Sequence, residues 1–173
     1  LLLADQMGVP RGKRVTVAEL ETVHRTGLLL PGSMFALDVL GGTVQSTGLG
    51  FDEGDADRVC LPLAGTLVPV PWLGADIAQM QVSMYEHDRT PFHGDPRHVL
   101  ESVAARFTAL GLKPVMAVEL EFYLVEPNAD ADYQLKPPIG RSGRSEPGRQ
   151  SYSIAAVNEF DPLFEDVYDY CEK

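Results

Sequence analysis

The sequence has no apolar run long enough to cross a membrane, and it has few of the cations that bind nucleic acid. A membrane helix needs about 20 consecutive apolar residues, but Asp, Glu or Pro interrupts every apolar stretch here. Lys and Arg total 14 against 25 Asp and Glu, which gives a net charge of −11. Because phosphate contacts require clustered cations, we expect neither a membrane nor a nucleic acid as a partner.

Cysteine is scarce as well. Cys60 and Cys171 form no C-x-x-C pair, which favours reduced, buried thiols in a cytoplasmic protein, although a single disulfide also fits. No secretory signal peptide is recognisable, because the leading leucines are few and lack a basic flank. The first residue is not methionine, so we expect the native start to lie upstream.

What is present is the composition of an ordinary globular protein. The 173 residues are 45% hydrophobic, with 16 Gly and 13 Pro scattered along the chain. This suffices for one domain, or for a small domain and part of another. The composition shifts near residues 92–96, where a strand-rich region gives way to a helix and then a strand. We therefore expect two domains, 1–93 and 94–173.

Alternation of apolar residues and turn residues predicts several short strands in the first domain. These strands cover residues 1–4, 14–17, 57–63, 66–70 and 75–85. Helical spacing predicts a short helix over 16–26 that Gly27 ends. Residues 28–54 are rich in Gly, Ser and Thr, and we expect mostly loop there.

The second domain begins with the clearest helix. Asp95 is a good N-cap, and Pro96 suits the first helical position. Apolar residues then recur at helical spacing until Gly111, and His98 is predicted to lie on the surface. The pattern then predicts the following elements: a strand over 114–125, a polar and flexible excursion over 128–150, and a short strand within 151–169 before a helix over 162–171.

The predicted strand at 114–125 carries two carboxylates. Side chains alternate along a strand, so Glu119 and Glu121 point to the same side, about 6.6–7 Å apart, while the apolar face from Met116 to Leu124 is expected to be buried. Such a pair could bind Mg²⁺ or Mn²⁺, which prefer oxygen ligands. The same spacing also fits a strand with one solvated face.

The string AVELEFYL, residues 117–124, resembles the E-x-E strand that opens the catalytic domain of glutamine synthetases. Upstream, ADQMGVPRGKRV, SMFALDV, GDADRVCLPLAGTLVPVPW and SMYEHDRTPFHGDPRHVL resemble further segments of that family, in the same order. The segments FALDV, TGLG and PVPW are similar to sequences of the γ-glutamylpolyamine synthetase branch. The resemblance implies an α+β fold, with a small β-grasp N-terminal domain followed by the truncated start of the catalytic domain.

The resemblance also implies roles for single residues. Glu119 and Glu121 would be metal ligands, and Asp38 in FALDV would hold the ammonium or amine nucleophile across a subunit interface. Asp57 in ADRVCLP would be a second aspartate near that site, and Tyr152 in QSYSI would lie at the nucleophile pocket. Ordinary glutamine synthetases have Asp-Gly-Ser-Ser where this chain has Asp-Val-Leu-Gly from Asp38, which puts ammonia as the nucleophile in doubt.

The function implied by the resemblance is ATP-dependent ligation, with Mg²⁺ or Mn²⁺, of the γ-carboxylate of glutamate to ammonia or an amine through an acyl phosphate. The family assembles as rings, so a homo-oligomer is expected. We expect this stretch alone to be inactive, because the remaining metal-binding and ATP-binding segments of the family lie beyond it. A truncated, non-catalytic binding or regulatory module is the alternative.

Overall fold

The computed structural model describes residues 1–51, 54–128, 130, 132–145, 148 and 150–172. The chain divides into two compact units, Leu1–Val115 and Met116–Lys173. Both strands and helices occur in the described residues, so the structure is of mixed α and β composition. The predicted domain boundary at 93/94 and the β-grasp topology remain predictions. None of the helices within the described ranges combines the length and hydropathy that crossing a bilayer requires.

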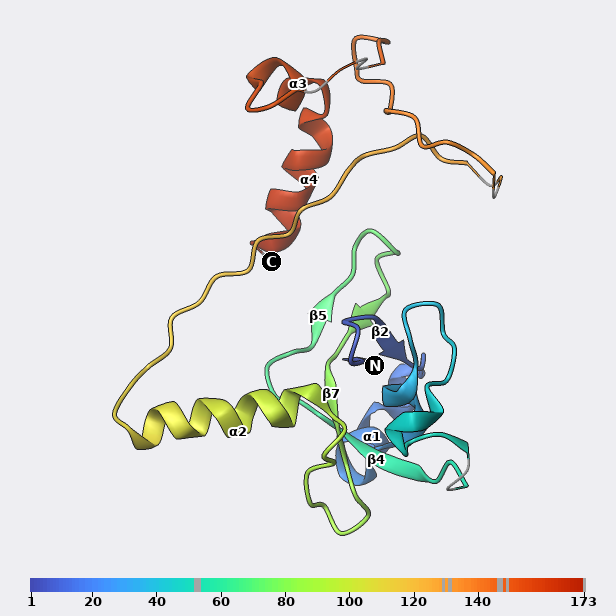
Figure 1. Ribbon diagram of the computed structural model, residues 1–173, viewed down its shortest axis with the longest axis vertical. Coiled ribbons are helices and arrows are strands. Elements are labelled where there is room, and N and C mark those ends of the chain that lie inside the picture. The colour runs from blue at the N-terminus through green and yellow to red at the C-terminus, as the bar shows by residue number, and fades with distance from the viewer. Residues whose placement is uncertain (52–53, 129, 131, 146–147, 149, 173) are drawn as a thin grey trace. The chain divides into compact units, whose positions relative to one another are not determined.

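The first unit is built around a three-stranded antiparallel sheet (Figure 1). Its strands are β3 (Leu28–Pro31), β4 (Asp57–Pro62) and β7 (Val82–Tyr85), in the order β3-β4-β7. Two smaller antiparallel pairs accompany it. The first consists of β1 (Leu2–Ala4) and β2 (Pro10–Gly12), and the second of β5 (Val68–Pro69) and β6 (Ala78–Gln79).

Side chains from β1, the central sheet and the segments beside it form the hydrophobic core. The buried members are Leu3, Leu30, Phe35, Cys60, Val82, Met84 and Phe92. Burial raises the pKa of the Cys60 thiol to about 12, so this thiol stays protonated and unreactive at neutral pH. Both cysteines are free, but Cys171 is exposed. The prediction that both thiols are buried is therefore wrong for Cys171, which ends a helix whose described residues bury none of its side chains fully.

The predicted loop over 28–54 is wrong at its start, where β3 pairs with β4. An unbroken run of three leucines lacks the alternation that reveals a half-buried strand, so the pattern gave no indication of it. Two short 3-10 helices follow, η2 (Gly32–Ala36) and η3 (Gln45–Thr47). The predicted helix over 16–26 divides into η1 (Val17–Glu19) and α1 (Leu20–Thr26), and it ends at Gly27 as expected.

The predicted strand over 14–17 is also wrong, because its place is taken by β2 at Pro10–Gly12. The cause is the side chain of Asp5, whose Oδ1 accepts hydrogen bonds from the backbone N–H groups of Met7 and Val9 at 2.8 and 2.9 Å. These bonds close the turn early and set Pro10 opposite Ala4. The last predicted strand of this region, 75–85, is present as β6 and β7 with a break at residues 80–81.

Helix α2 (Pro96–Ala109) confirms the predicted cap at Asp95, whose Oδ1 accepts a hydrogen bond from the Arg97 N–H. The prediction that His98 lies on the surface is wrong, because only 9% of this residue is exposed. Its Nε2 lies 2.8 Å from the carbonyl oxygen of Met84, and Oδ2 of Asp95 accepts the Met84 N–H at 2.8 Å. Helical periodicity cannot show that the first turn of α2 is fastened to β7 in this way.

The second unit contains α3 (Ile154–Glu159) and α4 (Asp161–Cys171). Helix α4 matches the predicted helix over 162–171, whereas α3 replaces the short strand predicted before it. Ser153 explains the difference, since its hydroxyl accepts the Ala156 N–H and caps α3. The described residues of the predicted excursion, 128–150, contain neither a helix nor an extended strand, only the bridge between Ile139 and Ser145.

The predicted strand over 114–125 does not form. Figure 1 draws these residues without an arrow, and Met116, Val118 and Leu120 are 77%, 85% and 84% exposed. The expectation that this apolar face is buried is therefore wrong for this structure. A strand needs a hydrogen-bonded neighbour, because its backbone polar groups are otherwise unpaired. None of the described residues pairs with this segment as a strand.

The buried Asp5 carboxylate predicts acid sensitivity. Its burial acts to raise the pKa, but hydrogen bonds from Arg11, Val9 and Met7 outweigh this and lower the pKa below 3.8. A lowered folded-state pKa contributes stability above the unfolded value, and that contribution is lost as pH falls through the folded value. We expect Asp5→Asn to lower the melting temperature at pH 7, and to make its decline below about pH 4 shallower.

The measurement is thermal unfolding of the full-length protein followed from pH 7 to pH 2. Asp76→Asn serves as the control, because Asp76 is exposed. Glu19, Asp88 and Glu159 also have lowered pKa values, so part of the acid sensitivity should persist in the Asp5 variant. A decline as steep as that of the unchanged protein would contradict the role of Asp5.

Candidate functional site

Asp38 lies at the base of a tight loop that follows η2. Its Oδ1 accepts the backbone N–H groups of Leu40 and Gly42 at 2.9 and 2.8 Å. Its own N–H donates to the Gly42 carbonyl at 2.8 Å, and Leu37 and Thr43 form an antiparallel bridge. The loop is therefore closed on itself, and one carboxylate oxygen is held by backbone donors.

Gly42 fits this loop closely. A Cβ atom at that position would lie 2.9 Å from Oδ2 of Asp38, so any larger residue would force the carboxylate to move. The base of the loop is also connected to β2, since Nη2 of Arg11 lies 3.5 Å from the Asp38 carbonyl oxygen. Asp38 itself is half-buried. This carboxylate is thus held in one position while it remains accessible.

Asp57 has different surroundings. It is the first residue of β4, opposite Pro31, and its side chain is exposed. Its backbone carbonyl oxygen lies 2.9 Å from Nε2 of His87. Among the described residues, the hydrogen-bond partners of Asp38 and Asp57 are different and the two residues do not bond to each other. The structure places both residues in the first unit without linking them.

Glu119 and Glu121 are both exposed, on a segment of the second unit that forms no strand. Strand alternation therefore does not place the two carboxylates on one face in this structure. Carboxylate oxygens suit Mg²⁺ or Mn²⁺ chemically, but the described residues contain no group of three or more His, Cys, Asp or Glu side chains that could hold a metal ion. The two glutamates could therefore supply part of the ligands of a metal ion, and the other ligands would have to come from elsewhere in the protein.

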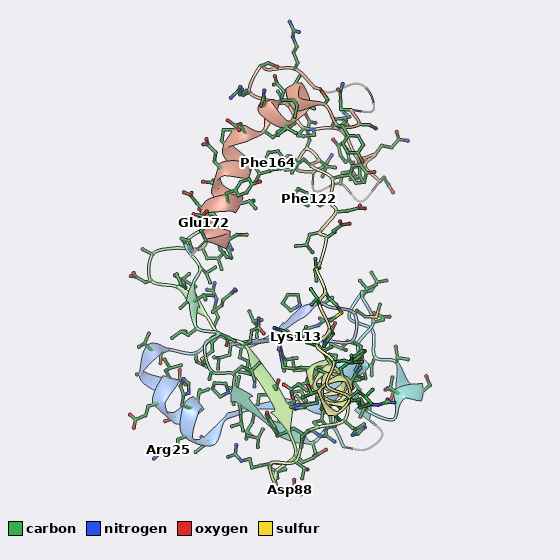
Figure 2. The ribbon with its side chains drawn as sticks, turned by 90° about the vertical axis from the view of Figure 1, so that its left-hand side faces the viewer. Arg25, Asp88, Lys113, Phe122, Phe164 and Glu172 are labelled. Carbon is green, nitrogen blue, oxygen red and sulfur yellow. The ribbon has the colours of Figure 1, made fainter. Side chains whose placement is uncertain are left out.

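Tyr152 is fully exposed and has a positive φ of 55°. It is among the residues that line a cavity of about 760 Å³ within the second unit. Phe122 and Phe164, which Figure 2 labels, also line this cavity. The lining is largely apolar, with Lys136 and Gln150 among its polar members.

Sequence reasoning missed the pair formed by Asp5 and Arg11. Nε of Arg11 donates to Oδ2 of Asp5 at 2.9 Å, and the Asp5 side chain is fully covered. Arg11 also reaches the Asp38 carbonyl oxygen, so the pair connects the first hairpin to the Asp38 loop. The spacing of Asp5 to Gly8, an aspartate three residues before a glycine, is typical of a turn that an aspartate closes and could have indicated it.

Sequence reasoning also missed the surroundings of Arg58. Its Nε lies 3.2 Å from both carboxylate oxygens of Glu86, and its guanidinium lies 4.1 Å above the centre of the Phe92 ring. Phe92 in turn packs against Phe35 with ring centres 5.8 Å apart. Arg58 therefore closes one edge of the core. The sequence gives no sign of this role, because a single arginine within a strand pattern does not reveal its contacts.

A family model of the glutamine synthetase catalytic domain matches residues 93–173. Gamma-glutamylputrescine synthetase PuuA of Escherichia coli K12 is 39% identical over 169 residues, which cover 96% of this chain and 35% of that protein. Glutamine synthetase of Pyrococcus horikoshii is 30% identical over 141 residues, covering 81% of this chain and 28% of that protein. A solved structure of apo GmaS without ligand covers 63% of this chain and 23% of that chain, with 25% identity and a TM-score of 0.49.

The chain belongs to the glutamine synthetase family. Within that family it is similar to the E. coli gamma-glutamylputrescine synthetase along nearly its whole length. It spans about a third of the length of the relatives it matches.

Proposed function

We propose that the full-length protein is an ATP-dependent ligase that joins the γ-carboxylate of glutamate to an amine. The observation that carries this proposal is the 39% identity to gamma-glutamylputrescine synthetase over 96% of this chain. The loop at Asp38 adds to it, because a half-buried carboxylate fixed by two backbone N–H groups suits a cationic substrate group.

Asp38 would act on the nucleophile. An amine is protonated at neutral pH and cannot attack until it loses a proton. A positioned carboxylate can hold the alkylammonium group and then accept that proton. The neutral amine can then attack the γ-glutamyl acyl phosphate, forming the amide bond and releasing phosphate. Asp57 is proposed as a second carboxylate near the amine, and Tyr152 as a residue of the nucleophile pocket.

Glu119 and Glu121 are proposed to bind divalent ions together with ligands from the rest of the protein. When bound, Mg²⁺ or Mn²⁺ neutralises the charge that gathers as phosphoryl transfer brings ATP and glutamate together. Both residues are exposed, which leaves their carboxylate oxygens accessible to a metal ion and is consistent with this role. We further propose a β-grasp domain over 1–93, the start of the catalytic domain over 94–173, and a ring-type homo-oligomer in which Asp38 serves a neighbouring subunit.

The test is phosphate release by the full-length protein with ATP, Mg²⁺ and glutamate. We expect release that depends on an added amine, together with a γ-glutamyl amide product. Ammonium, putrescine and propylamine should be compared, and reactions without glutamate serve as the control. Phosphate release that depends on neither glutamate nor amine would contradict the proposal. A complete lack of turnover would instead support a binding or regulatory module.

A further inference from the structure

The tip of the Asp38 loop carries two exposed aliphatic residues. Leu40 is 93% exposed and Val39 is 65% exposed. They directly follow Asp38, whose carboxylate accepts the Leu40 N–H. A single exposed leucine is ordinary on a protein surface, but here two lie together beside a fixed carboxylate.

The loop geometry does not require aliphatic residues at these positions. The closing hydrogen bonds run from the backbone N–H groups of Leu40 and Gly42 to the Asp38 carboxylate, from the Asp38 N–H to the Gly42 carbonyl, and from the Gly41 N–H to the Asp38 carbonyl. Gly41 has a φ of 85°, and Asp38 limits the space at Gly42, so the loop conformation explains why glycine occupies both positions. None of these bonds uses the side chain of Val39 or Leu40, so they do not require an aliphatic residue at either position.

The hydrophobic core does not explain them either. Core packing in the first unit involves Leu30, Phe35 and Phe92, and the nearest buried residue before the loop is Ala36. Exposed aliphatic surface gains free energy only when something apolar covers it. The covering group must tolerate, or require, a carboxylate beside it.

We propose that Val39 and Leu40 determine amine specificity by contacting the hydrocarbon part of an alkylamine whose ammonium group Asp38 holds. The proposal rests on the function proposed above and names the substrate class, an amine with an aliphatic chain. Ammonium would meet the carboxylate alone and gain nothing from the two aliphatic side chains. An alkylamine or diamine would use both, because a cationic end and an apolar body match a carboxylate beside apolar surface.

The test is Leu40→Ser in the full-length enzyme. The readout is the ratio of kcat/KM for putrescine to kcat/KM for ammonium, with propylamine as a second alkylamine. We expect the ratio to fall by roughly tenfold, because one lost apolar contact in a specificity pocket is worth about 10–200-fold. The loss should arise mainly as a higher KM for the alkylamine, since the contact is made equally before and during reaction.

Leu73→Ser is the matched control, because Leu73 is another exposed leucine of the first unit, 57% exposed, in the loop between β5 and β6. Its ratio should match that of the unchanged enzyme. Val39→Thr, which keeps the side-chain shape, provides a second variant and should move the ratio in the same direction. Size-exclusion chromatography of each variant monitors assembly.

The possible results distinguish failure of the specificity role from failure of the proposed ligase function. An unchanged ratio in Leu40→Ser, or an equal fall for ammonium and putrescine with loss of assembly, overturns the specificity role and assigns the tip to subunit contact. Failure of the unchanged enzyme to use any amine overturns the proposed function itself. A fall in the ratio with assembly intact supports both.

Discussion

Replacing Asp38 by asparagine in the full-length protein is expected to lower kcat/KM for the amine by about 100-fold or more, with little change in ATP binding. Positioned acid–base groups contribute roughly 10²–10⁴-fold to rate. Asparagine can still accept the N–H groups of Leu40 and Gly42 through its amide oxygen. The loop should therefore keep its shape while it loses the charge that holds an ammonium group and the base that accepts its proton.

The measurement pairs steady-state kinetics over amine concentration with direct titration of ATP. Asp76→Asn is the control, since it removes one exposed carboxylate of the same unit elsewhere. Asp57→Asn should fall between the two if Asp57 lies near the amine as proposed. Equal losses of amine use and ATP affinity in Asp38→Asn would show that the change acts on the fold or assembly rather than on the nucleophile.

Replacing Glu121 by glutamine is expected to raise the Mg²⁺ or Mn²⁺ concentration needed for half-maximal activity by at least about tenfold. Even residues that only orient metal ligands are worth about 10–100-fold in affinity or activity, and a lost carboxylate ligand should cost no less. Glutamine keeps the size of the side chain but removes its charge. Glu119→Gln should act in the same direction.

Glu165→Gln is the matched control, because Glu165 is an exposed glutamate of α4 in the same unit. Binding of Mn²⁺ can be followed by electron paramagnetic resonance, which reads metal affinity without turnover. If Glu121→Gln and Glu165→Gln bind Mn²⁺ equally well, the glutamates at 119 and 121 form a solvated surface and the metal role is wrong.

The sequence predicted helix α2 and its two ends well. Asp95, Pro96 and Gly111 define α2 through cap chemistry and backbone preference, which depend only on neighbours in the chain. The same holds for β4 and for α4, whose patterns are strong and whose bounds agree within a few residues.

Several of the errors concern features that depend on residues far along the chain. His98 is buried because Met84, from a strand well upstream, accepts its hydrogen bond. Strand β3 exists because β4 pairs with it, although Leu28–Leu30 has no alternating pattern. The strand predicted over 114–125 shows the converse case. Its alternating pattern is strong, but none of the described residues pairs with it as a neighbouring strand.

For the candidate site, the sequence by itself determined the family and the identity of the residues proposed to act, because order and spacing along the chain carry that information. It also determined the segments whose structure depends on near neighbours. Only the tertiary structure decided that Arg11 joins the first hairpin to the Asp38 loop, that the Asp5 side chain is covered, and that Leu40 remains exposed. The physical reason is that burial and hydrogen-bond partners are set by contacts between distant segments, which a one-dimensional pattern does not record.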